Sequence, residues 1–171
     1  KRQGLKLITQ YDNLTKEQAA YVDNYFLKEV YPVLTPMAGD SSRPFPLIRN
    51  KSLNIAALLQ KKKGDQELEF ATVQVPSVLP RVYEVKRDGE AVRLILLEEI
   101  IERHMGKLFL NYNIECAFSF RIMRNADFAL EEEEAQDLLK EIEKQLKKRQ
   151  WGQAIRLEVE DGIEKRLLDI I

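Results

Sequence analysis

Two pairs of short apolar segments, each pair joined by turn-forming residues, constrain the fold of this chain more than any other feature. Segments 53–59 and 68–75 are rich in aliphatic and β-branched residues, and Lys-Lys-Lys-Gly-Asp lies between them. Segments 81–85 and 91–96 flank an Asp-Gly pair. Apolar runs of this length with turn chemistry between them are typical of β-hairpins. The sequence therefore predicts a largely antiparallel framework of neighbouring strands.

Apolar residues at helical spacing predict the helices that pack on this framework. The first helix begins after Thr15, where a capping box with a Gln three residues later satisfies free amides, and it ends at Pro32. The second helix covers 97–108. The longest covers 131–152, with acidic residues in its first turn and basic residues in its last, as the helix dipole favours. A further helix begins near residue 163.

Alternating apolar residues add strands at 118–123 and 155–159, and a strand or an extended lead-in at 4–8. Four prolines between residues 31 and 50 exclude a central strand there and favour a stiff, ordered crossing segment. The predicted fold class is α+β, with a mixed, largely antiparallel sheet and packed helices. We expect residues 1–171 to form one domain that is cut short within its C-terminal helix.

Length and composition narrow the class of protein. A chain of 171 residues with 44% hydrophobic content can bury one core. Its formal net charge of -1 argues against generic nucleic-acid coating. The lone Cys116 has no partner for an internal disulfide, which favours a reducing cytosol. The sequence has no initiator Met and no apolar stretch long enough for a signal peptide or membrane span, so we expect a piece of a longer protein.

Most charged or ionisable groups in the sequence are better explained by structure than by catalysis. His104, the only histidine, falls on the apolar side of a predicted helix, so we expect a packed or helix-end histidine rather than a catalytic one. Four consecutive glutamates at 131–134 spread around a helix and so favour a solvated face over a magnesium site. The lysines at 61–63 sit at a hairpin tip. No glycine-rich phosphate loop is present.

Arg121, Arg124 and Arg156 are the candidate phosphate-binding residues. Arg121 and Arg156 lie within strand patterns and Arg124 closes one, so a sheet could hold their guanidinium groups for phosphate oxygens. Pairing with nearby acidic residues on the sheet surface is the commoner use of such arginines and is favoured here. No catalytic residue and no metal ligand are assigned.

Several motifs resemble the polyphosphate kinase head domain. They lie at 25–36, 43–46, 50–54, 75–81 and 120–127, and read YFLKEVYPVLTP, RPFP, NKSLN, VPSVLPR and FRIMRNAD. The blocks keep the family's order over nearly the whole chain. Two positions depart from the family pattern, because Arg43 stands where histidine is common and Met123 where threonine is common.

The resemblance implies a domain of an enzyme that reversibly transfers the terminal phosphate of ATP to inorganic polyphosphate through a phosphohistidine, with magnesium. The family's catalytic histidines, phosphate-binding arginines and metal site lie in two C-terminal domains, and His104 does not match the phosphorylated position. The chain itself is therefore expected to hold no cofactor and to be inactive alone. The implied fold resembles that of phosphohistidine phosphatases.

The resemblance also implies partners and a location. The expected partners are the other domains of the same polypeptide and further subunits of a homo-oligomer, with polyphosphate as a potential ligand and no nucleic acid. The alternatives are a polyphosphate-binding module that uses the three arginines, and an independent phosphohistidine phosphatase, which rests on fold analogy alone. The expected location is the cytoplasm, with membrane association of the full-length enzyme left open.

Overall fold

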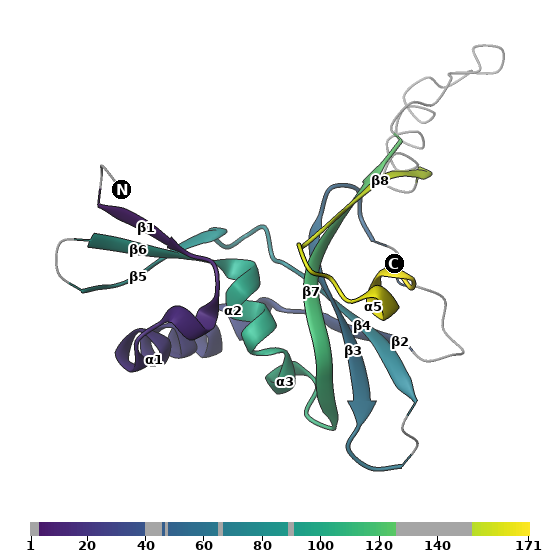
Figure 1. Cartoon of the computed structure of the whole chain (residues 1–171), viewed down its shortest axis with the longest axis horizontal. Coiled ribbons are helices and arrows are strands. Elements are labelled where there is room, and N and C mark those ends of the chain that lie inside the picture. Colours follow the sequence, from purple (N-terminus) through teal and green to yellow (C-terminus); the bar gives the residue numbers. More distant parts are fainter. Residues whose placement is uncertain (1–3, 40–45, 47, 65–66, 89–90, 126–151) are drawn as a thin grey trace, which may run out of the picture.

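The computed structural model describes residues 4–39, 46, 48–64, 67–88, 91–125 and 152–171. The strands form two sheets, and Figure 1 shows helix α2 between them, with α1 against the smaller sheet and α5 beside the larger one. The α+β class is confirmed. The expected single sheet is instead two sheets, because the chain leaves the larger one through a stretch that holds Pro76 and Pro80.

The smaller sheet has three strands in the order β1-β6-β5. Its strands are β1 (Leu5–Ile8), β5 (Val82–Asp88) and β6 (Ala91–Leu96). Strand β1 runs parallel to β6, whereas β5 and β6 form the predicted antiparallel hairpin. Strands β1 and β5 are therefore the two edges of a mixed sheet.

The larger sheet has five antiparallel strands in the order β2-β4-β3-β7-β8. Its strands are β2 (Pro36–Gly39), β3 (Leu53–Lys61), β4 (Leu68–Gln74), β7 (Tyr112–Arg124) and β8 (Ala154–Val159). The other predicted hairpin, formed by segments 53–59 and 68–75, is confirmed as β3 and β4. Strand β2 comes from the proline-rich segment and lies at an edge, where a residue without an N–H is tolerated.

The helical elements within the described residues are short. They are η1 (Tyr11–Asn13), α1 (Lys16–Tyr25), η2 (Phe26–Val30), η3 (Tyr31–Val33), α2 (Leu97–Arg103), α3 (Met105–Leu108) and α5 (Lys165–Leu168). The capping box at Thr15 is present. After α1 the chain makes a π-helical turn, in which the Tyr31 N–H donates to the Phe26 carbonyl. The helix predicted over 97–108 divides at His104, and the one predicted over 131–152 lies outside the described residues except for Gly152 at its end.

Two hydrophobic cores lie on opposite faces of the larger sheet. Strand β3 contributes to both, because Ile55, Ala57 and Leu59 face one core and alternate with Ala56 and Leu58, which face the other. This explains why the segment reads as a continuous apolar run rather than an alternating one. The first core also holds buried side chains of α1, α2 and the smaller sheet, and the second is closed by α5.

The start of β8 lies tightly against the end of β7. A Cβ atom at the buried Gly152 would lie 2.1 Å from the carbonyl oxygen of Asn125, so only glycine fits there. Arg124 closes the same corner, because its Nη1 donates to the Gly152 carbonyl at 3.0 Å and its Nε to the Ile48 carbonyl at 3.0 Å. Among the described helices, none has the length and apolar character needed to span a bilayer.

Candidate functional site

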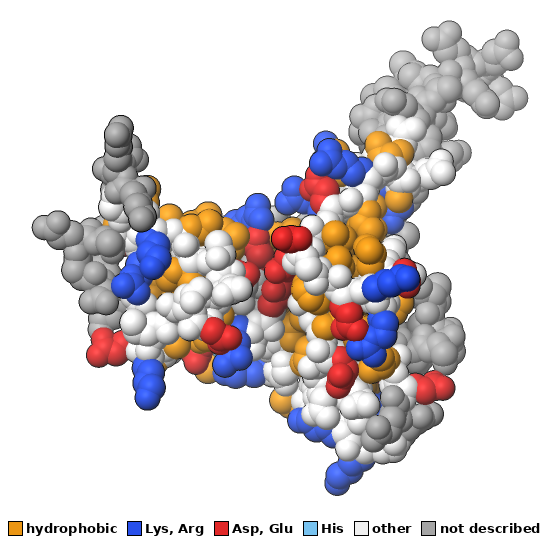
Figure 2. Space-filling view, viewed as in Figure 1, with side chains coloured by type: hydrophobic (Ala, Val, Ile, Leu, Met, Phe, Trp, Pro, Cys, Tyr) orange, Lys and Arg blue, Asp and Glu red, His pale blue; other side chains and the backbone are white. Residues whose placement is uncertain are grey.

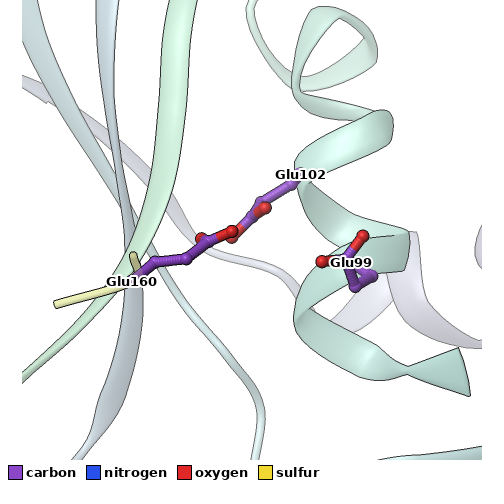
Figure 3. Close-up of side chains that lie close together, drawn as sticks. All are labelled: Glu99, Glu102 and Glu160. Carbon is purple, nitrogen blue, oxygen red and sulfur yellow. The ribbon is translucent and has the colours of Figure 1, made fainter. Parts of the chain in front are cut away.

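Three carboxylates from distant parts of the chain converge between the two sheets. Glu99 and Glu102 lie on α2, and Glu160 lies directly after β8. One oxygen of each lies within 4.8 Å of the others. Figure 3 shows the Glu102 and Glu160 side chains pointing toward each other across the gap between helix and sheet. We call these residues the acidic cluster.

The fold holds two of these side chains by hydrogen bonds from neighbouring strands and loops. Glu160 Oε2 accepts from the Ser119 N–H at 3.0 Å and from the Ser119 hydroxyl at 3.2 Å. Glu99 accepts a hydrogen bond from the backbone of Tyr11. Glu102 follows Glu99 by three residues, which places both on the same helix face. Each of the three carboxylates is half-buried, so packing also restricts its position.

The surroundings of the acidic cluster favour uptake of protons. Burial, reinforced by the neighbouring carboxylates, raises the pKa of Glu102 to about 9. The same causes raise the pKa of Glu99 to about 7, against the Tyr11 hydrogen bond that lowers it. Oε1 of Glu102 is buried and has no hydrogen-bond partner among the described residues. Such a group of carboxyls can share protons or approach a cationic group, because three charges this close repel one another.

A fourth carboxylate beside the cluster has its own partner. Glu98 is buried, and the Arg81 Nε lies 2.9 Å from its Oε1 and 3.2 Å from its Oε2. Hydrogen bonding to Glu98 raises the pKa of Arg81. Because α2 follows β6 without a break, this pair ties the start of the helix to the chain that enters β5. Glu98 is thus a structural carboxylate.

His104 is packed at the junction of α2 and α3. Its ring is 4% exposed and stacks on Phe26, with ring centroids 4.1 Å apart and planes 12° from parallel. Nδ1 lies 2.7 Å from the Ile100 carbonyl oxygen and Nε2 lies 3.0 Å from Asp23 Oδ1. Burial lowers the pKa of His104, although both oxygen neighbours act in the opposite direction. Both ring nitrogens are engaged, as expected of a packed, helix-end histidine.

The structure brings two of the three candidate arginines together. Arg121 on β7 and Arg156 on β8 both approach Glu158, with Nη1 to Oε2 at 3.7 Å and Nη2 to Oε1 at 3.1 Å. This is the pairing that the sequence favoured. Arg124 lies apart from them, because its guanidinium binds the backbone carbonyls at the β7–β8 corner. Figure 2 shows Lys and Arg side chains near β8 interleaved with acidic ones rather than gathered into one basic patch.

The other charged runs behave as local structure where they are described. At the tip of the β3–β4 hairpin, Lys61 pairs with Glu69 at 2.6 Å and Lys62 donates to the Leu110 carbonyl at 2.9 Å. The glutamates at 131–134 lie outside the described residues. Sequence reasoning missed the acidic cluster. The spacing of Glu99 and Glu102 on a helix was visible, but nothing in the sequence indicated that Glu160 would join them.

This geometry defines an α+β domain of two sheets whose single histidine and corner arginine serve internal contacts. Comparison with known proteins gives the family: residues 17–171 match the polyphosphate kinase middle domain, and the chain belongs to that family. It is 45% identical over 173 residues to a polyphosphate kinase of Bacillus cereus, covering 99% of this chain and 24% of that protein. It is 49% identical over 162 residues to one from Lactiplantibacillus plantarum, covering 95% of this chain and 22% of that protein.

A solved structure has the same fold over most of the chain. The crystal structure of polyphosphate kinase from Porphyromonas gingivalis matches with a TM-score of 0.67 and 25% identity, covering 88% of this chain and 24% of that one. The chain thus spans about a quarter of the length of the curated relatives it matches. The family resemblance of its sequence motifs is confirmed.

Proposed function

We propose that this chain is a non-catalytic domain of a polyphosphate kinase, an enzyme that reversibly moves the terminal phosphate of ATP onto polyphosphate with magnesium. In this proposal, residues 1–171 form one domain that supports subunit assembly and frames the path of the polymer. Phosphate transfer itself takes place in other parts of a longer cytoplasmic polypeptide. The family membership and the quarter-length match support this view.

The observation that carries the proposal is the environment of His104. A histidine that accepts a phosphoryl group needs a ring nitrogen that the donor phosphate can reach in line. His104 is buried against Phe26, and its nitrogens face the Ile100 carbonyl and Asp23. An incoming phosphate would have to displace Asp23 of α1 to reach Nε2 and break the contact with the Ile100 carbonyl to reach Nδ1.

The test uses the full-length enzyme that contains this chain. His104→Gln in that enzyme should keep the rate of polyphosphate synthesis within about threefold, since this histidine lies outside the proposed chemistry. After incubation with γ-labelled ATP, mass spectrometry should find the phosphohistidine outside residues 1–171. A phosphoryl group on His104 would contradict the proposal. Asp23→Asn, which leaves the imidazole in place, separates loss of packing from loss of a phosphate acceptor.

A second candidate function is direct contact with polyphosphate through the arginines of β7 and β8. It is favoured by the arrangement at Glu158, where Arg121 and Arg156 share one carboxylate and so leave one positive charge in excess. Nε of Arg121 also has no hydrogen-bond partner within the described part of the chain. Arg124 contributes less to this candidate, because its guanidinium already binds two carbonyls.

Salt dependence of polyphosphate binding tests this candidate. Binding releases counterions, so the full-length Arg121→Gln/Arg156→Gln variant should bind labelled polyphosphate more weakly. Its slope of log K against log salt should also be shallower by about 0.7 for each phosphate group that the variant no longer neutralises, if polyphosphate behaves as a single strand does. Arg49→Gln, at an exposed position, is the matched control. An unchanged slope for the double variant removes this candidate.

A further inference from the structure

Arg121, Arg156 and Glu158 form a small charged group on one face of the larger sheet. The strand register pairs Arg121 of β7 with Glu158 of β8. It also pairs Met123 with Arg156, so the three charged side chains project from the same face of the two strands. Ile122, the neighbour of Arg121, points the other way and is buried in the second core. The backbone that carries Arg121 is therefore held in place.

Arg121 is incompletely paired. Its Nη1 lies 3.7 Å from Glu158 Oε2, which is longer than a hydrogen bond. Its Nε is buried and has no hydrogen-bond partner within the described residues. The side chain as a whole is 34% exposed, so solvent reaches its outer nitrogens. A guanidinium with unused donors favours an additional acceptor, because buried donors without a partner are costly.

The contact between Glu158 and Arg156 is easily opened. Nη2 of Arg156 lies 3.1 Å from Glu158 Oε1, and the two side chains are 66% and 38% exposed. An ion pair this exposed stabilises a fold very little, because water screens both charges. A stronger anion can therefore replace the carboxylate beside both arginines at little cost to the domain.

The next carboxylate along the chain is engaged elsewhere. Glu160 accepts hydrogen bonds from the N–H and the hydroxyl of Ser119 and belongs to the acidic cluster. Among the described residues, Glu158 is the carboxylate that pairs with Arg121 and with Arg156. Its oxygens lie beside both guanidinium groups, where the oxygens of a phosphate group would bind.

We propose that Glu158 is an internal competitor of polyphosphate. Its carboxylate holds the place between Arg121 and Arg156 when the polymer is absent, and a phosphate group of the polymer displaces it. Glu158 thus lowers the affinity of this face for polyphosphate. This rests on the second candidate function, in which the two arginines contact the polymer directly.

Binding of labelled polyphosphate to the full-length enzyme at about 0.1 M salt tests the proposal. Glu158→Gln keeps the side-chain shape and removes the competing charge, so affinity should rise about three- to fivefold, as expected for one unit charge about 4 Å away in water. Glu115→Gln is the matched control, because this exposed residue lies about 20 Å from Arg121 along β7. An affinity for Glu158→Gln that falls, stays the same or rises no more than that of the control would overturn the proposal.

A double-mutant cycle separates this proposal from the function on which it rests. In the Arg121→Gln/Arg156→Gln background, Glu158→Gln should bring no gain, because no guanidinium remains to compete for. A gain of the same size there would overturn the proposal, since Glu158 would then repel the polymer independently of the arginines. If the arginine variant binds polyphosphate as the parent does, the second candidate function fails, and the proposal with it. If it binds more weakly while Glu158→Gln brings no gain in the parent, only the competitor role of Glu158 fails.

Discussion

Replacing Glu102 by glutamine should stabilise the domain at neutral pH. The unfolded chain releases the Glu102 proton near its ordinary pKa of 4.5, whereas the folded domain holds it up to about 9. A carboxyl whose folded pKa is raised contributes its stability fully below the unfolded pKa, and that stability is lost as the pH rises toward the folded pKa. At pH 7, folding must therefore take up a proton. Glutamine keeps the shape of the protonated side chain and removes this requirement.

The size of the effect follows from the pH interval. From pH 4.5 to pH 7 the free-energy cost of keeping Glu102 protonated in the folded domain grows by about 1.4 kcal/mol per pH unit. This gives an upper limit of about 3 kcal/mol. Glu102 is only half-buried, and solvent screening of a partly exposed group reduces this cost. We therefore expect Glu102→Gln to raise the free energy of unfolding by about 1–2 kcal/mol at pH 7 and by almost nothing at pH 4.5.

Urea unfolding followed by circular dichroism between pH 4.5 and pH 8.5 measures this difference. Glu115→Gln, at an exposed position on β7, is the matched control and should change stability little at any pH. The reasoning is refuted if Glu102→Gln is less stable than the parent at pH 7. It is equally refuted if the stability difference is the same at both ends of the pH range.

Three further predictions concern single contacts. Arg81→Met should lower the free energy of unfolding, measured with urea, by about 2–3 kcal/mol, because it leaves the buried Glu98 unpaired. The double variant Arg81→Met/Glu98→Leu should recover most of that loss. Gly152→Ala should lower the thermal midpoint by several degrees, since its Cβ would meet the Asn125 carbonyl; an unchanged midpoint contradicts the tight corner. The single imidazole signal of His104 should titrate below about pH 6.5 by NMR, because burial lowers its pKa, and a higher midpoint would count against this.

The local elements could be predicted from the sequence because their signals are local. The Thr15 capping box, the two hairpins and the strand at 155–159 each depend on residues within a few positions of one another, and all are present. The division of the strands between two sheets depends instead on which distant segments pair. The parallel contact of β1 with β6 joins residues almost 90 positions apart, and no local pattern encodes it.

The site was harder to predict for the same reason. Pairing of Arg121 and Arg156 with an acidic neighbour was anticipated, since all three lie in strand patterns. The role of Arg124 at the β7–β8 corner was not anticipated, because every residue has a backbone carbonyl and the sequence does not indicate which ones a guanidinium will contact. The acidic cluster requires Glu160, whose loop reaches α2 only once the larger sheet is assembled.

The wide turn after α1 has a consequence for how this part of the chain can vary. A π-helical turn is equivalent to one extra residue inserted into an α-helix. Removing one residue between Phe26 and Val30 would let the turn close to ordinary α-helical winding, and the chain downstream would keep its orientation relative to the helix. Val30, now fully buried, would stay in the core. Deletion of one residue in this stretch should therefore be tolerated better than insertion of one.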